Sequence, residues 1–252
     1  MPIPRYPAST ARSAAPVAGL FDGLLLVDKP AGPTSHDVVA AIRRTFRIEK
    51  VGHGGTLDPA ATGLLVLLLG KGTTLSNQVM GCDKSYVGAM RLGTVTNSQD
   101  MDGEVVSEAS CDGIAAEAIA ARMAAHVGDG YQTPPMVSAV KIGGVPLYKL
   151  ARKGKTVERE PRLVHLYNFR LLAWTPPLAA FEVACSKGTY VRTLCHDIGA
   201  ELGCGGCLQS LRRTASGKLR VEDAHPLDEL LALDREGLAA RIVPYYTYLN
   251  SR

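Results

Sequence analysis

A single carboxylate stands out in residues 51–63, VGHGGTLDPAATG, because glycines, small residues and a proline surround it. This residue, Asp58, follows His53 closely and precedes a run of apolar residues, Leu64–Leu69. The proline after Asp58 favours an extended backbone at the aspartate, which directs its side chain one way. Two interpretations stay open on these residues alone. Asp-Pro is a common start of a turn, and an isolated, directed carboxylate also suits catalysis.

The composition is that of an ordinary globular protein. The chain has 252 residues, of which 46% are hydrophobic and 21% charged, enough for one large or two small domains. Its longest apolar run is too short to span a bilayer. Residues 1–20 lack the apolar core of a signal peptide and are expected to form a disordered tail, although two arginines without an acid also suit organelle targeting.

The cysteines indicate a reducing compartment. All six are scattered without the spacing of a disulfide framework, which favours free thiols and a cytoplasmic protein. Cys204 and Cys207 form a C-x-x-C pair, but a single pair is weak evidence for zinc. We therefore expect no metal site.

Positive charge gathers in two blocks although the net charge is only +4. Residues 211–220, LRRTASGKLR, contain four basic residues and no acid. The larger block, residues 131–170, has two glutamates and eight basic residues: Lys141, Lys149, Arg152, Lys153, Lys155, Arg159, Arg162 and Arg170. Such a distribution indicates a surface that binds a polyanion, or an ordinary solvated surface.

The surrounding pattern predicts an α+β fold with a mixed or antiparallel sheet and flanking helices. A helix that Ser35 caps should run to Phe46, and 114–127 and 190–202 should be helical, as should segments near the C-terminus. The segment 137–155 should form a strand, a glycine turn and a short basic helix, within an insertion at about 131–160. The expected strands are 23–30, 64–69, 85–93, 162–174, 178–188 and a pair within 208–221.

Several common active-site motifs are absent from the sequence, including the P-loop, the dinucleotide-binding glycines, G-x-S-x-G and H-E-x-x-H. Six other segments occur in an order typical of one family and together cover about residues 22–220. They are GLLLVDKPAGPTSHDVV, VGHGGTLDPAATGLLVLLLGKGTT, DKSYVGAMRLGTVTNSQDMDGE, PPMVSAVKIGGVPLYKLARKG, SKGTYVRTLCHDIGAELGCGG and LRRTASG. On these segments the chain resembles the bacterial TruB-type tRNA pseudouridine-55 synthases, which isomerise a T-loop uridine without cofactor or metal.

The resemblance assigns catalytic roles that the residue types alone could not. It implies that Asp58 is the nucleophilic aspartate and that Arg192 pairs with it, whereas by itself Arg192 would be an ordinary surface helix arginine. Tyr86 would stack on the target uracil and take part in proton transfer. By composition alone Tyr86 would be a core residue of a strand.

Substrate-binding roles follow from the same resemblance. Tyr190 and Leu211 would line the uridine pocket, and His53 would fill the space that the flipped uridine leaves in the T-loop. Without the resemblance, the first two would be packing residues and His53 an exposed loop residue. GHGG replaces the more usual GHTG beside the catalytic loop, a change that we expect to be tolerated, and Lys29-Pro30 is interpreted as structural.

The resemblance also implies a partner and a domain arrangement. The basic insertion would close over the T-arm of tRNA, with phosphate contacts from Lys149, Arg152 and Lys153. We expect a monomer with no guide RNA and no membrane partner, and a single catalytic domain at 21–252 without a C-terminal PUA-type module. The alternative functions are a tRNA-binding folding helper that acts independently of catalysis and a guide-RNA-dependent synthase.

Overall fold

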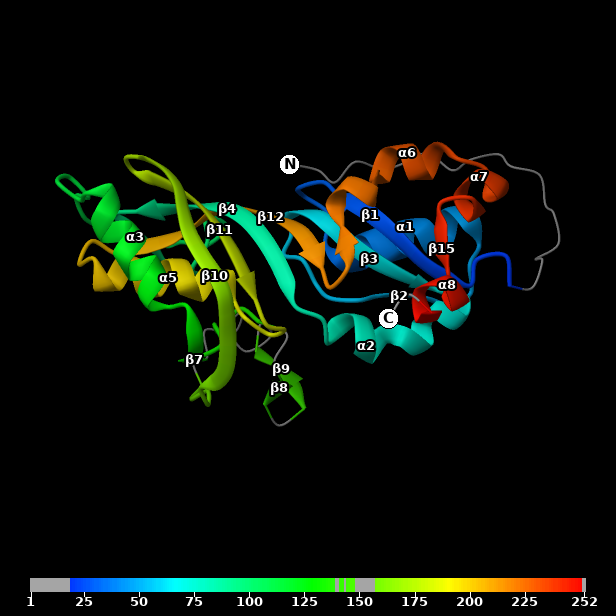
Figure 1. Cartoon of the computed structure of the whole chain (residues 1–252), viewed down its shortest axis with the longest axis horizontal. Coiled ribbons are helices and arrows are strands. Elements are labelled where there is room, and N and C mark those ends of the chain that lie inside the picture. Colours follow the sequence, from blue (N-terminus) through cyan, green and yellow to red (C-terminus); the bar gives the residue numbers. More distant parts are fainter. Residues whose placement is uncertain (1–18, 139–140, 143, 148–156, 251–252) are drawn as a thin grey trace. The chain divides into compact units, whose positions relative to one another are not determined.

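The computed structural model describes residues 19–138, 141–142, 144–147 and 157–250, which divide into two compact units (Figure 1). Unit 1 comprises Met1–Lys84 and Arg212–Arg252, and unit 2 comprises Ser85–Leu211. The chain passes between the units twice, within strands β4 and β12. The expected single domain therefore contains two units, and most of the expected disordered tail lies outside the described residues.

Unit 1 is built on a mixed sheet in the order β14-β1-β3-β12, with β15 beside β1 and β2 beside β3. β1 and β3 are antiparallel along their whole length, whereas β14 runs parallel to β1 and β12 parallel to β3. The mixed sheet confirms the expected fold class. The elements of unit 1 are β1 (Gly23–Lys29), α1 (Ser35–Phe46), β2 (Val51–His53), β3 (Thr62–Leu69), η1 (Gly70–Leu75), α2 (Ser76–Met80), β13 (Leu219–Arg220), η2 (Val221–Asp223), β14 (His225–Pro226), α6 (Leu227–Ala232), α7 (Arg235–Ala239), β15 (Ile242–Pro244) and α8 (Tyr245–Asn250).

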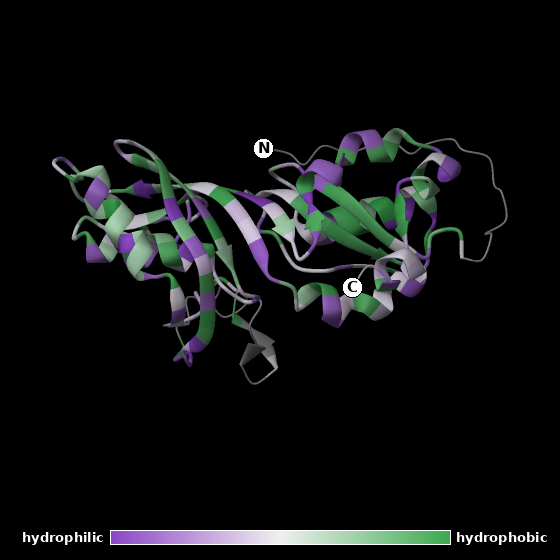
Figure 2. Cartoon of the chain, in the orientation of Figure 1, coloured by the Kyte–Doolittle hydropathy of each residue, from purple (hydrophilic) through white to green (hydrophobic). Residues whose placement is uncertain are grey.

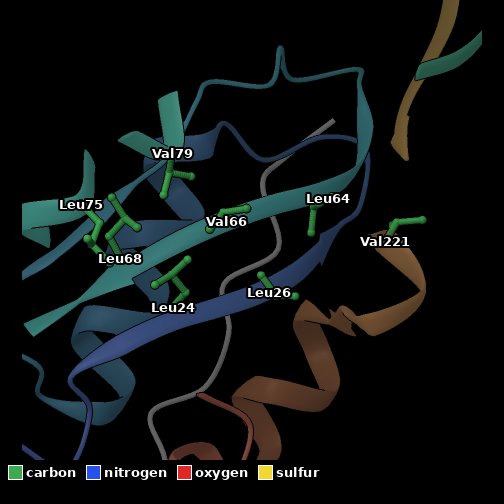
Figure 3. Close-up of a cluster of buried hydrophobic side chains, with 8 residues drawn as sticks. All are labelled: Leu24, Leu26, Leu64, Val66, Leu68, Leu75, Val79 and Val221. Carbon is green, nitrogen blue, oxygen red and sulfur yellow. The ribbon is translucent and has the colours of Figure 1, made fainter. Parts of the chain in front are cut away.

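The core of unit 1 lies on both faces of β1 and β3, which are hydrophobic along most of their length (Figure 2). On one face, leucine and valine side chains of the two strands pack with residues of η1, α2 and η2 (Figure 3). This cluster consists of Leu24, Leu26, Leu64, Val66, Leu68, Leu75, Val79 and Val221. The intervening residues, among them Leu25, Leu65 and Leu67, are also fully buried. Continuous apolar runs are expected where a sheet is covered on both sides.

Helix α1 begins at Ser35 as expected, but its N-cap is Thr34. The Thr34 hydroxyl accepts a hydrogen bond from Asp37 N at 3.0 Å, and the Asp37 carboxylate accepts one from Thr34 N at 2.9 Å. This reciprocal pair is a capping box. The prediction that Ser35 caps the helix is therefore wrong, because the Ser35 hydroxyl is engaged by a distant loop instead.

Unit 2 contains the part of the sheet in the order β12-β4-β11-β10-β7, in which β10 runs antiparallel to both β11 and β7. α3 packs against β10 and α5. None of the helices in the described residues has the length and apolar character needed to cross a bilayer. The elements of unit 2, with the two strands that enter unit 1, are β4 (Lys84–Leu92), β5 (Thr94–Thr96), β6 (Val105–Glu108), α3 (Ala116–Ala125), β7 (Gly128–Gln132), β8 (Lys141–Ile142), β9 (Val145–Pro146), β10 (Arg162–Thr175), β11 (Leu178–Cys185), α5 (Val191–Glu201) and β12 (Gly206–Ser216).

One expected helix begins two residues later than predicted. α3 begins at Ala116 rather than at Ile114, whose carbonyl oxygen instead accepts a hydrogen bond from Trp174 Nε1 at 3.0 Å. The expected basic helix before residue 155 lies outside the described residues, whereas the glycine turn before it joins β8 and β9 as an antiparallel pair.

Candidate active site

Asp58 lies in the loop between β2 and β3 of unit 1, and this loop is fixed by its own backbone. Gly54 N donates to Val66 O at 2.8 Å, and Gly32 N donates to Pro59 O at 2.9 Å. Ala61 N donates to Asp58 O at 3.1 Å, which makes a turn at the aspartate. The turn interpretation is therefore confirmed, and Asp58 is half-buried. The catalytic interpretation stays a prediction.

The residue before Asp58 is held by the first residue of α1. The Ser35 hydroxyl accepts a hydrogen bond from Leu57 N at 2.8 Å and lies 3.0 Å from Leu57 O, to which it donates. Both residues are buried, so water does not compete for these groups. Ser35 thus ties the Asp58 loop to α1 rather than capping that helix.

Lys29 supports the other side of the loop. Its side chain is 0% exposed, and its amine donates to Ala61 O at 2.7 Å, Pro30 O at 2.8 Å and Pro59 O at 3.1 Å. Burial lowers the pKa of Lys29 to about 8, while the nearby charge of Asp58 acts in the opposite direction. The lysine therefore combines the expected structural role with an electrostatic interaction with Asp58.

Arg213 of β12 is a second buried cation at this loop. Its guanidinium donates to Thr56 O at 2.6 Å and to Gly55 O and Leu64 O at 3.3 Å. The residue is 4% exposed. Sequence reasoning missed this role, because the motif LRRTASG shows only a basic strand and gives no sign of which arginine turns inward.

His53 lies at the end of β2 and is half-buried rather than freely exposed. Burial lowers its pKa, and the positive charges of Arg213 and His36 lower it further. Its Nδ1 accepts a hydrogen bond from Gly55 N at 3.3 Å. The imidazole is therefore neutral at neutral pH, with its proton on Nε2.

Arg192 of unit 2 is a buried residue, 4% exposed, in the first turn of α5. Its guanidinium donates to Ser98 O and Val137 O, each at 2.9 Å, and lies 3.3 Å from Asp100 Oδ2. The interpretation as an ordinary surface arginine is therefore wrong. The expected pairing of Arg192 with Asp58 joins residues of different units and stays a prediction.

Asp100 was not singled out from the sequence, and it lies in the polar segment TNSQDMDGE, residues 96–104. Its Oδ1 accepts hydrogen bonds from the Ser98 hydroxyl and from Asp102 N, while Oδ2 faces Arg192. Its backbone forms a bridge to Leu208 of β12. The only signal in the sequence was an acid among turn residues, which is too common to be specific.

Tyr86 and Leu211 lie on the same face of the unit 2 sheet. Tyr86 and Gly88 are two residues apart on β4 and therefore point to the same side. A Cβ atom placed on Gly88 would lie 3.2 Å from Leu211 Cδ1. Tyr86 is buried, whereas Leu211 is half-buried. Leu211 therefore lies against the face of β4 to which Tyr86 points.

Tyr190, the residue before α5, is held through its backbone. Tyr190 N donates to Gln132 Oε1 at 2.7 Å, and Gln132 Nε2 donates back to Tyr190 O at 3.0 Å. Gln132 is buried. Tyr190 is half-buried, and its backbone is fixed by this pair of hydrogen bonds.

The basic block of residues 131–170 is described only in part. Lys149, Arg152 and Lys153, which were predicted to contact phosphates, lie outside the described residues. Arg170 forms an ion pair with Glu182 at 2.7 Å, and Arg159 donates to Pro134 O at 3.1 Å. These two arginines therefore have protein partners.

The C-x-x-C pair does not form a metal centre in the part of the chain that the structure describes, where no group of three or more His, Cys, Asp or Glu residues could hold an ion. Cys204 Sγ lies 3.2 Å from Gly205 O, and Cys207 Sγ lies 3.5 Å from Met101 Sδ. Both cysteines are buried in unit 2. They are core residues there.

The chain matches two family models. Residues 43–191 match the N-terminal domain of the TruB family pseudouridylate synthases, and residues 192–250 match the C-terminal domain of tRNA pseudouridylate synthase B. The chain is 52% identical to a tRNA pseudouridine synthase B of Opitutus terrae, over 90% of this chain and 94% of that protein. It is 49% identical to one of Syntrophotalea carbinolica, over 84% and 70%.

Among solved structures, Cbf5 in a Cbf5–Nop10–Gar1 complex superposes with a TM-score of 0.70 at 30% identity, over 90% of this chain and 61% of that chain. The mixed sheet is thus that of the pseudouridine synthases, a class of RNA-modifying isomerases. Within this class, the chain belongs to the TruB family of pseudouridylate synthases.

Proposed function

We propose that the protein isomerises a uridine of tRNA to pseudouridine, at position 55 in the T-loop. The observation that carries the proposal is the 52% identity to a relative named tRNA pseudouridine synthase B, which extends over nearly the whole of both chains. The anchored loop around Asp58 supports it, because a nucleophile must be held in a productive geometry to react.

In this proposal Asp58 is the nucleophile. The reaction breaks the bond between N1 of the uracil and C1′ of the ribose, turns the base and forms a bond from C5 to the same carbon. C5 loses a proton and N1 gains one, so no atom is added and no redox cofactor or metal is required. The Asp58 carboxylate forms or stabilises the intermediate, and Lys29 and Arg213 hold the backbone of the loop that carries it.

Tyr86 and Arg192 complete the proposed catalytic set, and Tyr190 and Leu211 bind the base. The shared face of Tyr86 and Leu211 supports this, since a flipped base needs a flat contact on one side and an apolar one on the other. His53 enters the RNA in place of the uridine. Its neutral state supports this role, because an uncharged ring stacks among bases without losing a hydration shell.

Affinity for the T-arm comes from the basic insertion, and the enzyme acts as a monomer in the cytoplasm. Replacing Lys149, Arg152 and Lys153 together by alanine should weaken binding without changing which uridine reacts. Each lost phosphate contact should flatten the log–log salt dependence by about 0.7–0.9. Binding of a T-arm hairpin across a salt series measures this, and an unchanged slope would mean that these residues do not contact RNA.

The decisive experiment is release of tritium from tRNA labelled at C5 of uridine, with purified protein and no guide RNA. Release of one tritium per tRNA, mapped to position 55, is the expected result. The similarity to Cbf5, found in a complex with Nop10 and Gar1, makes the guide-free condition important. No release without a guide RNA would contradict the proposal.

A further inference from the structure

Arg212 and Asp28 form a two-pronged ion pair in unit 1. Arg212 Nη1 lies 2.8 Å from Asp28 Oδ1, and Nη2 lies 2.7 Å from Oδ2. The two residues belong to β12 and β1, which are not neighbours, because β3 runs between them. The arginine side chain therefore spans a whole strand to reach its partner.

Gly63 of β3 provides the passage. It is paired with Lys29 on one side and with Arg213 on the other. A Cβ atom at Gly63 would lie 3.0 Å from Arg212 Cγ and closer still to the backbone of Arg213. The φ angle of Gly63 is +93°, which also favours glycine. The strand thus lacks a side chain where the arginine crosses it, directly after the Asp58 loop.

Consecutive residues of β12 make different attachments. Arg212 reaches across β3 to β1, while Arg213 donates to the backbone of residues 55 and 56 in the Asp58 loop. The crossing of Arg212 therefore fixes the segment of β12 from which Arg213 reaches the loop. A shift of β12 along β3 would move every one of these contacts.

We propose that Asp28 and Arg212 are positioning residues for Asp58, a proposal that rests on the proposed function. They hold β12 in register, so that Arg213 keeps the Asp58 loop in its reactive geometry. Neither residue needs to touch the substrate for this effect.

The pair contributes more to geometry than to stability. The Arg212 side chain is 40% exposed and that of Asp28 is 27% exposed, and exposed ion pairs stabilise proteins little. Both border an open cavity of about 410 Å³ that also includes Thr62 and Lys29. Water can replace a removed group there, so single substitutions should fold.

The test compares Asp28→Asn, Arg212→Lys and Arg212→Gln with the wild type under saturating tRNA. A displaced loop should lower kcat by about tenfold to a hundredfold for Asp28→Asn and Arg212→Gln. Arg212→Lys should recover part of this loss, since it keeps the charge but not the two-pronged geometry. The Kd for tRNA and the Tm should stay close to those of the wild type.

The control is Lys71→Gln, which breaks an exposed ion pair of unit 1, in which Lys71 Nζ lies 3.7 Å from Asp22 Oδ2. Its kcat should equal that of the wild type. The positioning role would be overturned if Asp28→Asn and Arg212→Gln kept the wild-type kcat. It would also be overturned if weaker RNA binding or a lower Tm fully explained the loss of kcat. An inactive wild type would instead overturn the proposed function, so the two failures are distinguishable.

Discussion

The two units fix their candidate functional groups in opposite ways. In unit 1 the group lies on a loop, and side chains from the surrounding elements reach its backbone: Lys29, Ser35 and Arg213 all bind peptide groups between residues 55 and 61. In unit 2 the group lies on a helix, and the side chain of Arg192 itself reaches out to the backbone of two other segments.

This difference determines where each unit is vulnerable. A helix is held in place by its own hydrogen bonds and by its packed face, so Arg192 needs few supports near its backbone. A loop has no such internal ladder and depends on each external anchor. Damage to the function should therefore be spread over many residues in unit 1 and concentrated at the functional side chains in unit 2.

The largest effect should come from Asp58→Asn, which keeps the shape and removes the charge. Turnover should fall by at least about a thousandfold, because the residue that reacts is lost while its anchors stay in place. Tritium release measures the rate, and tRNA binding should fall little, which serves as the control. If this variant still helps tRNA to fold, the helper activity coexists with catalysis. Substantial turnover by the variant would show that Asp58 is not the nucleophile.

The next prediction compares two ring side chains, Tyr86 of unit 2 and His53 of unit 1. Tyr86→Ala should lower turnover by at least about a hundredfold, since stacking and a proton carrier are lost together. His53→Ala should lower turnover by roughly tenfold, because the imidazole offsets only part of a base-flipping cost of a few kcal/mol. Single-turnover rates for both variants provide the measurement. Equal losses would contradict this division of roles.

A smaller effect separates two neighbouring hydroxyls. Ser35→Ala removes both bonds to Leu57 and should cost about 1–2 kcal/mol of stability and roughly tenfold in kcat. Thr34→Ala removes the helix cap and should cost about 1 kcal/mol. Its kcat should stay within about twofold of the wild type, since its bonds go to Asp37 rather than to the loop. Stability is measured by urea unfolding of both variants, together with kcat. A similar fall in kcat in the two variants would mean that the stability of α1, rather than the contact of Ser35 with Leu57, controls the rate.

The last prediction concerns the charge of Lys29, and it is measured on stability rather than on activity. Its pKa is about 8 in the folded protein against 10.5 in the unfolded one, so between these values the unfolded state binds more protons. The free energy of unfolding should therefore rise with pH in this window, by up to roughly 3 kcal/mol. Urea unfolding at pH 8 and 10.5 should show this rise in the wild type relative to Lys29→Met, and identical pH dependence in both would argue against a lowered pKa.

The strands and the Asp58 loop could be predicted because their signals are local. The run Leu64–Leu69 and the helical spacing from Val38 to Phe46 are visible within a few residues. The anchors could not be predicted in this way. Whether Thr34 or Ser35 caps α1 is decided by Leu57, and whether Arg212 or Arg213 turns inward is decided by strands that lie about 150 residues earlier in the sequence.

Arg192 and Asp100 show the same limit in unit 2. The first turn of α5 was predicted, but the burial of the arginine follows from the loops that carry Ser98 and Val137. The family resemblance supplied candidate roles where periodicity had none. The resemblance did not identify Ser35 and Arg213 as anchors of the Asp58 loop, because these residues were interpreted only as parts of motifs.

The interrupted chain of unit 1 has a consequence for how the protein is synthesised. β1 and β3 pair with each other early, but their other partners, Arg212 and Arg213 of β12 together with β14 and β15, are translated only after all of unit 2. On the ribosome, unit 2 is therefore synthesised before the first segment of unit 1 finds its remaining partners. Arg213 follows Thr56 of the Asp58 loop by 157 residues, so the loop acquires this anchor only after unit 2 has been translated.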